Sequence, residues 1–114
     1  MDTKGVHIIA DFWGCAESIL DDPELLMNAL RNAATKAEMT ILGEEEYRFS
    51  PQGFTGLLLL SESHISIHTY PEKGYAAIDI FTCGEKKTDL AITHLKMVLF
   101  PEKVKEITLS RGVI

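Results

Sequence analysis

The stretch Leu57-Leu58-Leu59-Leu60-Ser61-Glu62-Ser63-His64-Ile65-Ser66-Ile67-His68 places four leucines directly before a group of hydroxyl, carboxylate and imidazole side chains. A short apolar run of this kind predicts a fully buried strand. Polar groups beside a core cost free energy unless each has a hydrogen-bond partner, so a sequence that places them there often builds a functional site. A strand end followed by an ordinary polar turn is the alternative explanation.

The residues on both sides of this stretch predict six strands and two helices. Apolar and polar residues alternate in 6–12 and in 75–83, which is the pattern of a half-buried strand. The first helix is expected to start at Asp21-Asp22-Pro23-Glu24, because an aspartate cap and a proline at the first helical position both suit a helix N-terminus. Thr88 is expected to cap the second helix and Pro101 to end it. The predicted strands are 6–12, 40–49, 54–60, 64–70, 75–83 and 104–109, and the first helix runs to about Glu38.

The order strand, helix, four strands, helix, strand predicts an α+β fold. We expect residues 1–114 to form a single domain, a two-layer sandwich with a mostly antiparallel sheet and two helices on one face. Because the leucine run is apolar on both sides, the other face of the sheet needs a cover as well. A second copy of the chain is the simplest cover, so the fold is expected to be completed by homodimerisation.

The composition limits the classes of protein and partner. With 46% hydrophobic and 25% charged residues, the chain is expected to be soluble and globular. A net charge of −6 argues against nucleic acid and anionic membranes as main partners. The first residues show no apolar signal segment and no apolar run could span a bilayer, so a cytoplasmic protein is expected. The two cysteines, Cys15 and Cys83, are then expected to be free thiols.

Hairpin geometry predicts which polar side chains lie close together. If a tight turn joins the two strands that follow the leucine run, Cys83 lies opposite Glu62 or Ser63. If the polar stretch itself forms the preceding turn, Thr55 lies beside residues 68–70. The chain is therefore expected to carry two half-sites: Ser63 with Cys83 at one end of the sheet, and Thr55 with His68 and Glu72 nearer the other end.

Ser63 and His68 are not expected to meet within one chain. Five residues of regular strand separate them by roughly 16 Å, whereas a direct hydrogen bond needs about 3 Å. A two-fold homodimer would bring the first half-site of one chain to the second half-site of its partner.

Three stretches carry more specific information: Arg48-Phe49-Ser50-Pro51-Gln52-Gly53-Phe54-Thr55-Gly56, then Ser61-Glu62-Ser63-His64-Ile65-Ser66-Ile67-His68-Thr69-Tyr70-Pro71-Glu72, then Gly74-Tyr75-Ala76-Ala77-Ile78-Asp79-Ile80-Phe81-Thr82-Cys83-Gly84. Together they resemble the short prokaryotic S-adenosylmethionine decarboxylase proenzymes. The resemblance extends from Gly5 to about Gly112, and the Ser-Glu-Ser-His element with the downstream Thr-Cys-Gly is its most specific part.

The resemblance implies an inactive proenzyme that cleaves itself between Glu62 and Ser63, giving fragments 1–62 and 63–114. The serine oxygen attacks the preceding carbonyl to form an ester, and elimination and hydrolysis leave a pyruvoyl group where the serine stood. This covalent cofactor would form a Schiff base with the α-amine of S-adenosyl-L-methionine and draw electrons from the departing carboxylate. Cys83 is then expected to supply the proton that the product carbanion needs.

The remaining roles follow from the same resemblance. His68, supported by Thr55, is expected to transfer protons during cleavage. The family commonly has serine at the position of Thr55, and the β-branch of threonine restricts its hydroxyl, so processing could be slower. Trp13 and Phe49 are expected to flank the adenine of the substrate, and Glu72 to hydrogen-bond its ribose. The product would be the aminopropyl donor for spermidine synthesis.

Three other functions stay open at this point. The same pyruvoyl chemistry could act on another amino acid, such as ornithine or arginine. The chain could be an unprocessed, non-catalytic partner. A metal-binding domain would use Cys15, Cys83, His64 and His68, but the sequence has no close ligand pair of the C-x-x-C or H-x-x-x-H kind, so no metal is predicted.

Overall fold

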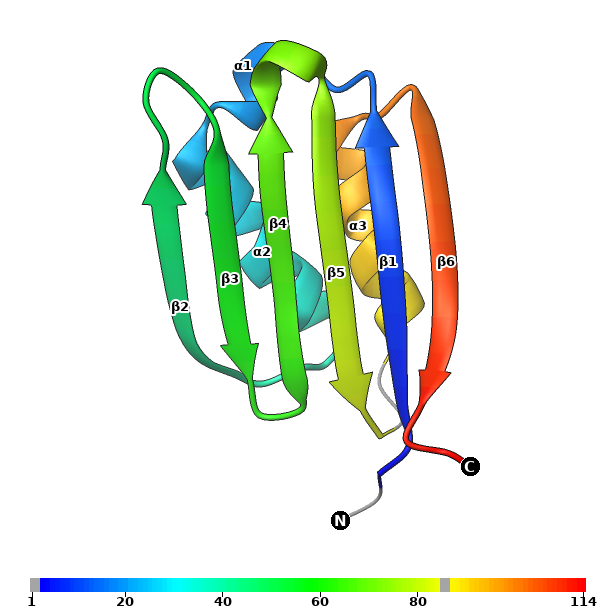
Figure 1. Ribbon diagram of the computed structural model, residues 1–114. Helices are drawn as coiled ribbons and strands as arrows, with labels where there is room; N and C mark the ends of the chain where they lie inside the picture. Colours follow the sequence, from blue (N-terminus) through cyan, green and yellow to red (C-terminus); the bar gives the residue numbers. More distant parts are fainter. Residues whose placement is uncertain (1–2, 85–86) are drawn as a thin grey trace.

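The computed structural model describes residues 3–84 and 87–114, which form one six-stranded sheet with helices on one side (Figure 1). In chain order the elements are β1 (Gly5–Trp13), α1 (Glu17–Leu20), α2 (Pro23–Lys36), β2 (Ile41–Arg48), β3 (Phe54–Leu60), β4 (Ser63–Tyr70), the 3-10 helix η1 (Pro71–Lys73), β5 (Tyr75–Cys83), α3 (Thr88–Leu99) and β6 (Lys103–Arg111). The strand order is β2-β3-β4-β5-β1-β6, and every neighbouring pair is antiparallel. The strands β4 and β5 are therefore the two central strands.

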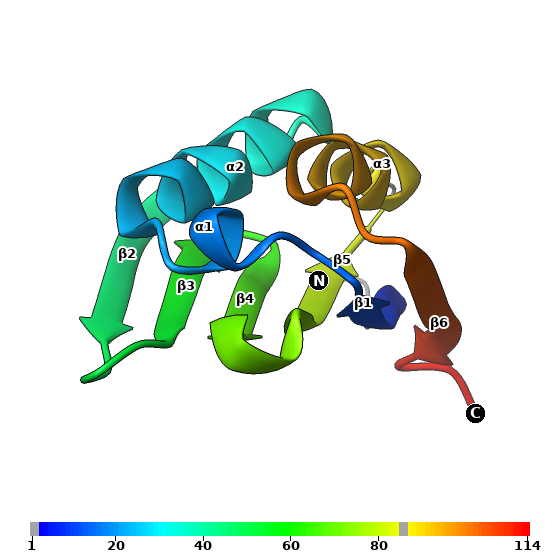
Figure 2. The same ribbon diagram turned by 90° about the horizontal axis from the view of Figure 1, so that it is seen from above.

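The helices α1, α2 and α3 all lie on one face of the sheet, which makes two layers (Figure 2). The predicted α+β architecture is confirmed. The short helix α1 is an addition that the sequence did not predict, because its four residues are too few to show a helical period. In the part of the chain that the structure describes, no helix is long and apolar enough to cross a membrane.

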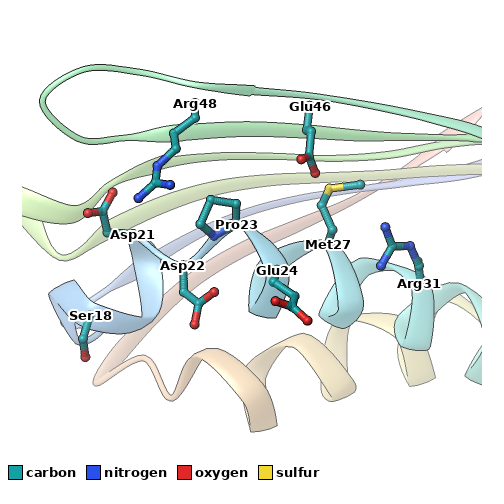
Figure 3. Close-up of a pocket in the computed structure, with 9 residues that line it drawn as sticks. All are labelled: Ser18, Asp21, Asp22, Pro23, Glu24, Met27, Arg31, Glu46 and Arg48. Atoms are coloured by element: carbon teal, nitrogen blue, oxygen red, sulfur yellow. The ribbon is translucent and has the colours of Figure 1, made fainter.

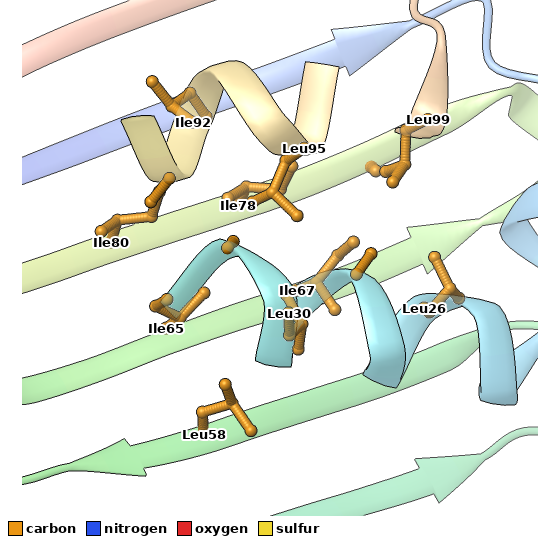
Figure 4. Close-up of a cluster of buried hydrophobic side chains, with 14 of the residues drawn as sticks. Leu26, Leu30, Leu58, Ile65, Ile67, Ile78, Ile80, Ile92, Leu95 and Leu99 are labelled. Carbon is orange, nitrogen blue, oxygen red and sulfur yellow. The ribbon is translucent and has the colours of Figure 1, made fainter. Parts of the chain in front are cut away.

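The core lies between the helices and the central strands (Figure 4). Successive strand residues point to opposite faces, so each strand contributes every second side chain to this layer. The helices contribute apolar stripes at helical spacing. The buried side chains that meet here are Leu58, Ile65, Ile67, Ile78 and Ile80 from the sheet, Leu26 and Leu30 from α2, and Ile92, Leu95 and Leu99 from α3.

The helix boundaries agree with the sequence prediction at one N-terminus and differ at the other. Asp22 caps α2 by accepting a hydrogen bond from the Leu25 amide at 3.1 Å. The helix ends before Glu38, whose φ of 60° is incompatible with helix continuation. The predicted cap Thr88 is wrong, because Lys87 is the N-cap and Thr88 is the first helical residue. Thr88 is buried, and the side chain of the N-cap residue Lys87 makes no capping hydrogen bond.

The leucine run is only half buried in a single chain, which corrects the prediction of a fully buried strand. Leu58 and Leu60 face the helices, but Leu57 is 39% exposed and Leu59 is 54% exposed. The helices cover only one face, so the alternate residues of β3 lie on the open face. Leu57 is in line there with Ile9 of β1 and Ile107 of β6, through consecutive cross-strand partners. Ser66 of β4 and Asp79 of β5 lie between Leu57 and Ile9 in this row, so polar side chains separate the apolar ones at the centre of the open face.

Candidate active site

The turn Ser61-Glu62 joins β3 to β4 and makes Ser63 the first residue of a central strand. Hydrogen bonds to neighbouring segments fix this turn. The Cys83 amide donates to the Glu62 carbonyl at 3.0 Å, and the Thr40 amide donates to Oε1 of the Glu62 side chain at 3.0 Å. The predicted register, with Cys83 opposite Glu62, is confirmed. The peptide bond between Glu62 and Ser63 is thus held beside a residue that carries a thiol.

The two cysteines have different environments, although both are free thiols. Cys15 is buried in the core, and burial raises the pKa of its thiol to about 11. A thiol with such a high pKa stays protonated and inert near neutral pH. Cys83 is half-buried and ends β5 beside the Ser61-Glu62 turn. Of the two thiols, Cys83 is therefore the one that lies at the same end of the sheet as Ser63.

A pocket of about 350 Å³ contains all three residues predicted for the second half-site, Thr55, His68 and Glu72, together with Phe49, which was predicted to flank the adenine. Thr55 and His68 are direct cross-strand partners, and Thr55 Oγ1 lies 2.9 Å from His68 Nδ1. Glu72 reaches the pocket from η1, which joins β4 to β5. The full lining is Phe49, Gln52, Gly53, Phe54, Thr55, His68, Thr69, Tyr70 and Glu72.

The loop between β2 and β3 positions Phe49 at the pocket. The Phe49 amide donates to the Gly53 carbonyl at 2.9 Å and closes the loop. Gly53 has a φ of 112°, a conformation that side chains other than glycine rarely adopt. The Gly53 amide points to Asp21 Oδ1 at 3.4 Å, which ties the loop to the segment before α2. The half-exposed Phe49 ring also contacts Tyr47, with ring centroids 4.8 Å apart.

The two half-sites lie toward opposite ends of the sheet, as the sequence predicts. In Figure 1 the turn between β3 and β4 is at the bottom and η1 is at the top. β4 pairs with β5 from Ser63 to Tyr70 and with β3 from His64 to Thr69, without a register shift in either pairing, so no bulge shortens the strand. The rise of a regular strand then separates Ser63 from His68 by roughly 16 Å. One chain alone does not bring these two residues together.

Trp13 lies outside the pocket of its own chain. It is the last residue of β1, and its ring is stacked on Tyr75 at 4.3 Å between centroids. The Tyr75 ring is in turn stacked on Tyr70 at 5.5 Å, and Tyr70 lines the pocket. Sequence reasoning missed Tyr70, although its position two residues after His68 places both on the same strand face. The two-residue period of β4 was the signal that could have identified it.

A second pocket, of about 670 Å³, lies on the helix side of the sheet and contains none of the predicted site residues. Residues of the α1–α2 segment face Glu46 and Arg48 of β2 across it (Figure 3). Several of its charges have structural partners: Asp22 caps α2, and Arg31 pairs with Glu44. Among residues 3–84 and 87–114, no three His, Cys, Asp or Glu side chains are grouped so that they could hold a metal ion.

Comparisons with known proteins agree on one family. A family model described as S-adenosylmethionine decarboxylase matches residues 6–112. S-adenosylmethionine decarboxylase proenzymes are similar to this chain. The proenzyme of Methanococcus maripaludis is 46% identical, and the match covers 100% of this chain and 94% of that protein. The proenzyme of Brevibacillus brevis is 47% identical, and the match covers 97% of this chain and 84% of that protein.

Among solved structures, an adenosylmethionine decarboxylase from Aquifex aeolicus superposes with a TM-score of 0.93 at 36% identity. The superposition covers 100% of this chain and 95% of that one. Sequence and fold therefore agree over the whole chain, and the chain belongs to the S-adenosylmethionine decarboxylase family.

Proposed function

We propose that this chain is made as a proenzyme, cleaves itself between Glu62 and Ser63, and then decarboxylates S-adenosyl-L-methionine with a pyruvoyl group derived from Ser63. The family to which it belongs is one of pyruvoyl-dependent decarboxylases. The observation that carries the proposal for this chain is the turn in which the Cys83 amide donates to the Glu62 carbonyl. A carbonyl held in this way is prepared for attack by a neighbouring hydroxyl.

Cleavage begins when Ser63 Oγ attacks the Glu62 carbonyl carbon and negative charge develops on the carbonyl oxygen. The Cys83 amide donates to that oxygen and stabilises the charge, as donors in oxyanion holes do. The proton that leaves Ser63 Oγ needs an acceptor, and the proposed one is His68 of the second chain in the dimer described below. Thr55 orients the imidazole through its contact with Nδ1.

The fold supports a cofactor at the position of Ser63. Ser63 pairs with Thr82 of β5, and the next residue, His64, pairs with both neighbouring strands, so a new chain end at Ser63 would remain held in the sheet after cleavage. When present, the pyruvoyl group supplies a carbonyl that accepts the electrons left by the departing carboxylate. The Cys83 thiol, at the same end of the sheet, then provides the proton for the product.

Substrate binding belongs to the second half-site. The pocket combines a flat apolar ring, Phe49, with a carboxylate, Glu72, and its volume of about 350 Å³ suits a small molecule. Stacking on Phe49 and hydrogen bonds to Glu72 would select the adenine and the ribose of the substrate. This pairing favours a nucleoside over ornithine or arginine, which have no ring to stack.

We propose further that two chains form a two-fold dimer with shared active sites. The apolar side chains on the open face of the sheet need a cover, and the two half-sites of one chain are too far apart to act together. A dimer that packs the open faces together would meet both needs.

A cytoplasmic location is part of the same proposal, and the two free thiols support it. The proposal includes no nucleic acid partner and no membrane partner.

The intact mass of the purified protein tests the proposal. The wild-type chain should appear as two fragments, the second of which starts with a pyruvoyl group instead of Ser63. The variant Ser63→Ala should remain a single uncut chain, because its side chain has no oxygen to form the ester. Cleavage of that variant between residues 62 and 63 would refute the mechanism.

A second assay, of carbon dioxide release with the wild-type protein, should show turnover of S-adenosyl-L-methionine and none of ornithine or arginine. Turnover of either of those amino acids instead would contradict the proposed substrate. An uncut, inactive wild-type chain would support the alternative of a non-catalytic partner.

A further inference from the structure

Three aromatic side chains from three strands form a continuous stack on the open face of the sheet. Trp13 of β1 lies against Tyr75 of β5, with centroids 4.3 Å apart and ring planes inclined by 26°. Tyr75 lies against Tyr70 of β4, with centroids 5.5 Å apart and planes inclined by 24°. Tyr70 is also part of the pocket wall that contains His68. The stack thus connects Trp13 to the second half-site through two ring contacts.

The central ring of the stack is anchored by a hydrogen bond. The Tyr75 hydroxyl donates to Asp11 Oδ1 at 2.7 Å, and this bond raises the pKa of Tyr75 to about 12. Tyr75 therefore remains a neutral donor throughout the physiological range. Asp11 and Trp13 are two residues apart on β1, so the strand that carries the indole also carries the anchor. The main chain is fixed as well, because the Glu102 amide donates to the Trp13 carbonyl at 2.8 Å.

Among residues 3–84 and 87–114, Tyr75 is the only aromatic ring stacked on the Trp13 indole. Tyr75 is stacked against it, while 44% of the Trp13 surface remains exposed. An exposed aromatic ring without support would exchange between rotamers, and a ligand that stacks on it would have to order it first. A ring that is already held by its neighbour avoids that loss of entropy.

We propose that Tyr75 is a positioning residue for substrate binding, which holds the Trp13 ring from one side so that its other side can receive a planar base. The inference rests on the proposed function, in which Trp13 stacks on the adenine of the substrate. Because Tyr75 acts on a ring that binds the base and not on reacting atoms, its loss should weaken binding without slowing the chemical step. No role of this kind follows from the sequence pattern, since Asp11 and Tyr75 are distant in the chain.

The test uses the fluorescence of Trp13, which is the only tryptophan in the chain. Adenosine is titrated into the purified protein, and the change in Trp13 emission gives a dissociation constant that requires no turnover. Two variants remove the anchor: Tyr75→Phe takes away the donor hydroxyl, and Asp11→Ala takes away the acceptor. The matched control is Glu24→Gln, which removes an exposed carboxylate from the first turn of α2.

We expect both anchor variants to raise the dissociation constant for adenosine about three- to tenfold, as for the loss of one hydrogen bond. They should also make Trp13 emission more sensitive to a neutral quencher, because the ring is less well held. The control should match the wild type in both measurements. In the processed enzyme, KM for S-adenosyl-L-methionine should rise by a similar factor while kcat stays unchanged.

Equal dissociation constants for the wild type and both anchor variants would overturn the inference, as would a wild-type Trp13 emission that adenosine leaves unchanged. Failure of the proposed function is a separate result. If the wild-type protein neither cleaves itself nor releases carbon dioxide while the anchor variants still weaken adenosine binding, the positioning role stands and the proposed reaction does not.

Discussion

At the scale of single residues, the contact between Thr55 and His68 is central to the proposed self-cleavage, because it orients the imidazole that accepts the serine proton. The 2.9 Å between Thr55 Oγ1 and His68 Nδ1 leaves the other ring nitrogen to face the scissile peptide of the partner chain in the proposed dimer. The sequence could predict this contact, because a short turn and a two-residue period fix the register between β3 and β4.

We predict that Thr55→Val slows self-cleavage about tenfold, because it keeps the branched shape of the side chain but loses the hydrogen bond that orients His68. Thr55→Ser should cleave at least as fast as the wild type, since it keeps the hydroxyl and loses the β-branch. The rate at which the two fragments appear after synthesis gives the measurement. A Thr55→Val protein that cleaves as fast as the wild type would remove Thr55 from the mechanism.

His94 of α3 is a residue whose environment the sequence did not indicate. Its Nε2 atom is buried without a hydrogen-bond partner among the described residues. Burial, with a smaller effect from the charge of Lys36, lowers the pKa of His94 below its ordinary value of 6.5. As the pH falls below that value, the unfolded chain binds a proton at His94 more readily than the folded chain does. Stability should therefore decrease as the pH falls through this range.

The variant His94→Leu should lose less stability than the wild type when the pH is lowered from about 7.5 to about 5.5, because it cannot bind that proton. Urea denaturation at the two pH values, with the wild type as control, measures the difference. An equal loss of stability in both proteins would show that His94 does not contribute to the pH dependence.

At the scale of elements, the approach of α2 to β3 depends on Gly56. A Cβ atom at this position would lie 2.8 Å from Met27 Sδ of α2 and 2.8 Å from Phe54 Cε2. Both neighbours are buried, so neither side chain can move away without disturbing the core. The glycine thus sets the distance between the helix layer and the sheet.

Gly56→Ala should destabilise the protein by about 1–3 kcal/mol, the usual cost of overpacking a core. The matched control is Gly43→Ala in β2, where a Cβ would meet no atom within 4 Å and the change should stay within about 0.5 kcal/mol. Chemical denaturation of both variants provides the comparison. If Gly56→Ala is as stable as the control, the layers are not packed as closely as described.

Several elements were predictable because local signals define them. Asp22 followed by Pro23 identified the start of α2, and alternation identified β1 and β5. The start of α3 was misplaced by one residue. Threonine is a residue type that often caps helices, but here Thr88 is buried as the first helical residue and Lys87 is the N-cap. The stack of Trp13 on Tyr75 was not predictable, because it depends on the pairing of β1 with β5, which lie far apart in the sequence.

At the scale of the whole molecule, the open face of the sheet links the fold to the function. The sequence predicted that the leucine run is apolar on both sides, but apolar periodicity does not distinguish a face covered by helices from one covered by a partner. The structure resolves this for one chain: Leu58 faces the helices, while Leu57 and Leu59 are exposed. The same face bears Thr55 and His68, so the apolar cover and the complete active site are proposed to come from the same partner.

The central claim is that each active site combines Ser63 of one chain with His68 of the other, and co-expression of two differently tagged variants tests it most directly. Ser63→Ala and His68→Ala should each be uncut when expressed alone. In purified mixed dimers, the mass of each chain should show that the His68→Ala chain is cleaved and the Ser63→Ala chain is intact, because only the former has a serine to cleave and its partner supplies the histidine. A His68→Ala chain that stays intact in such dimers would contradict the shared site.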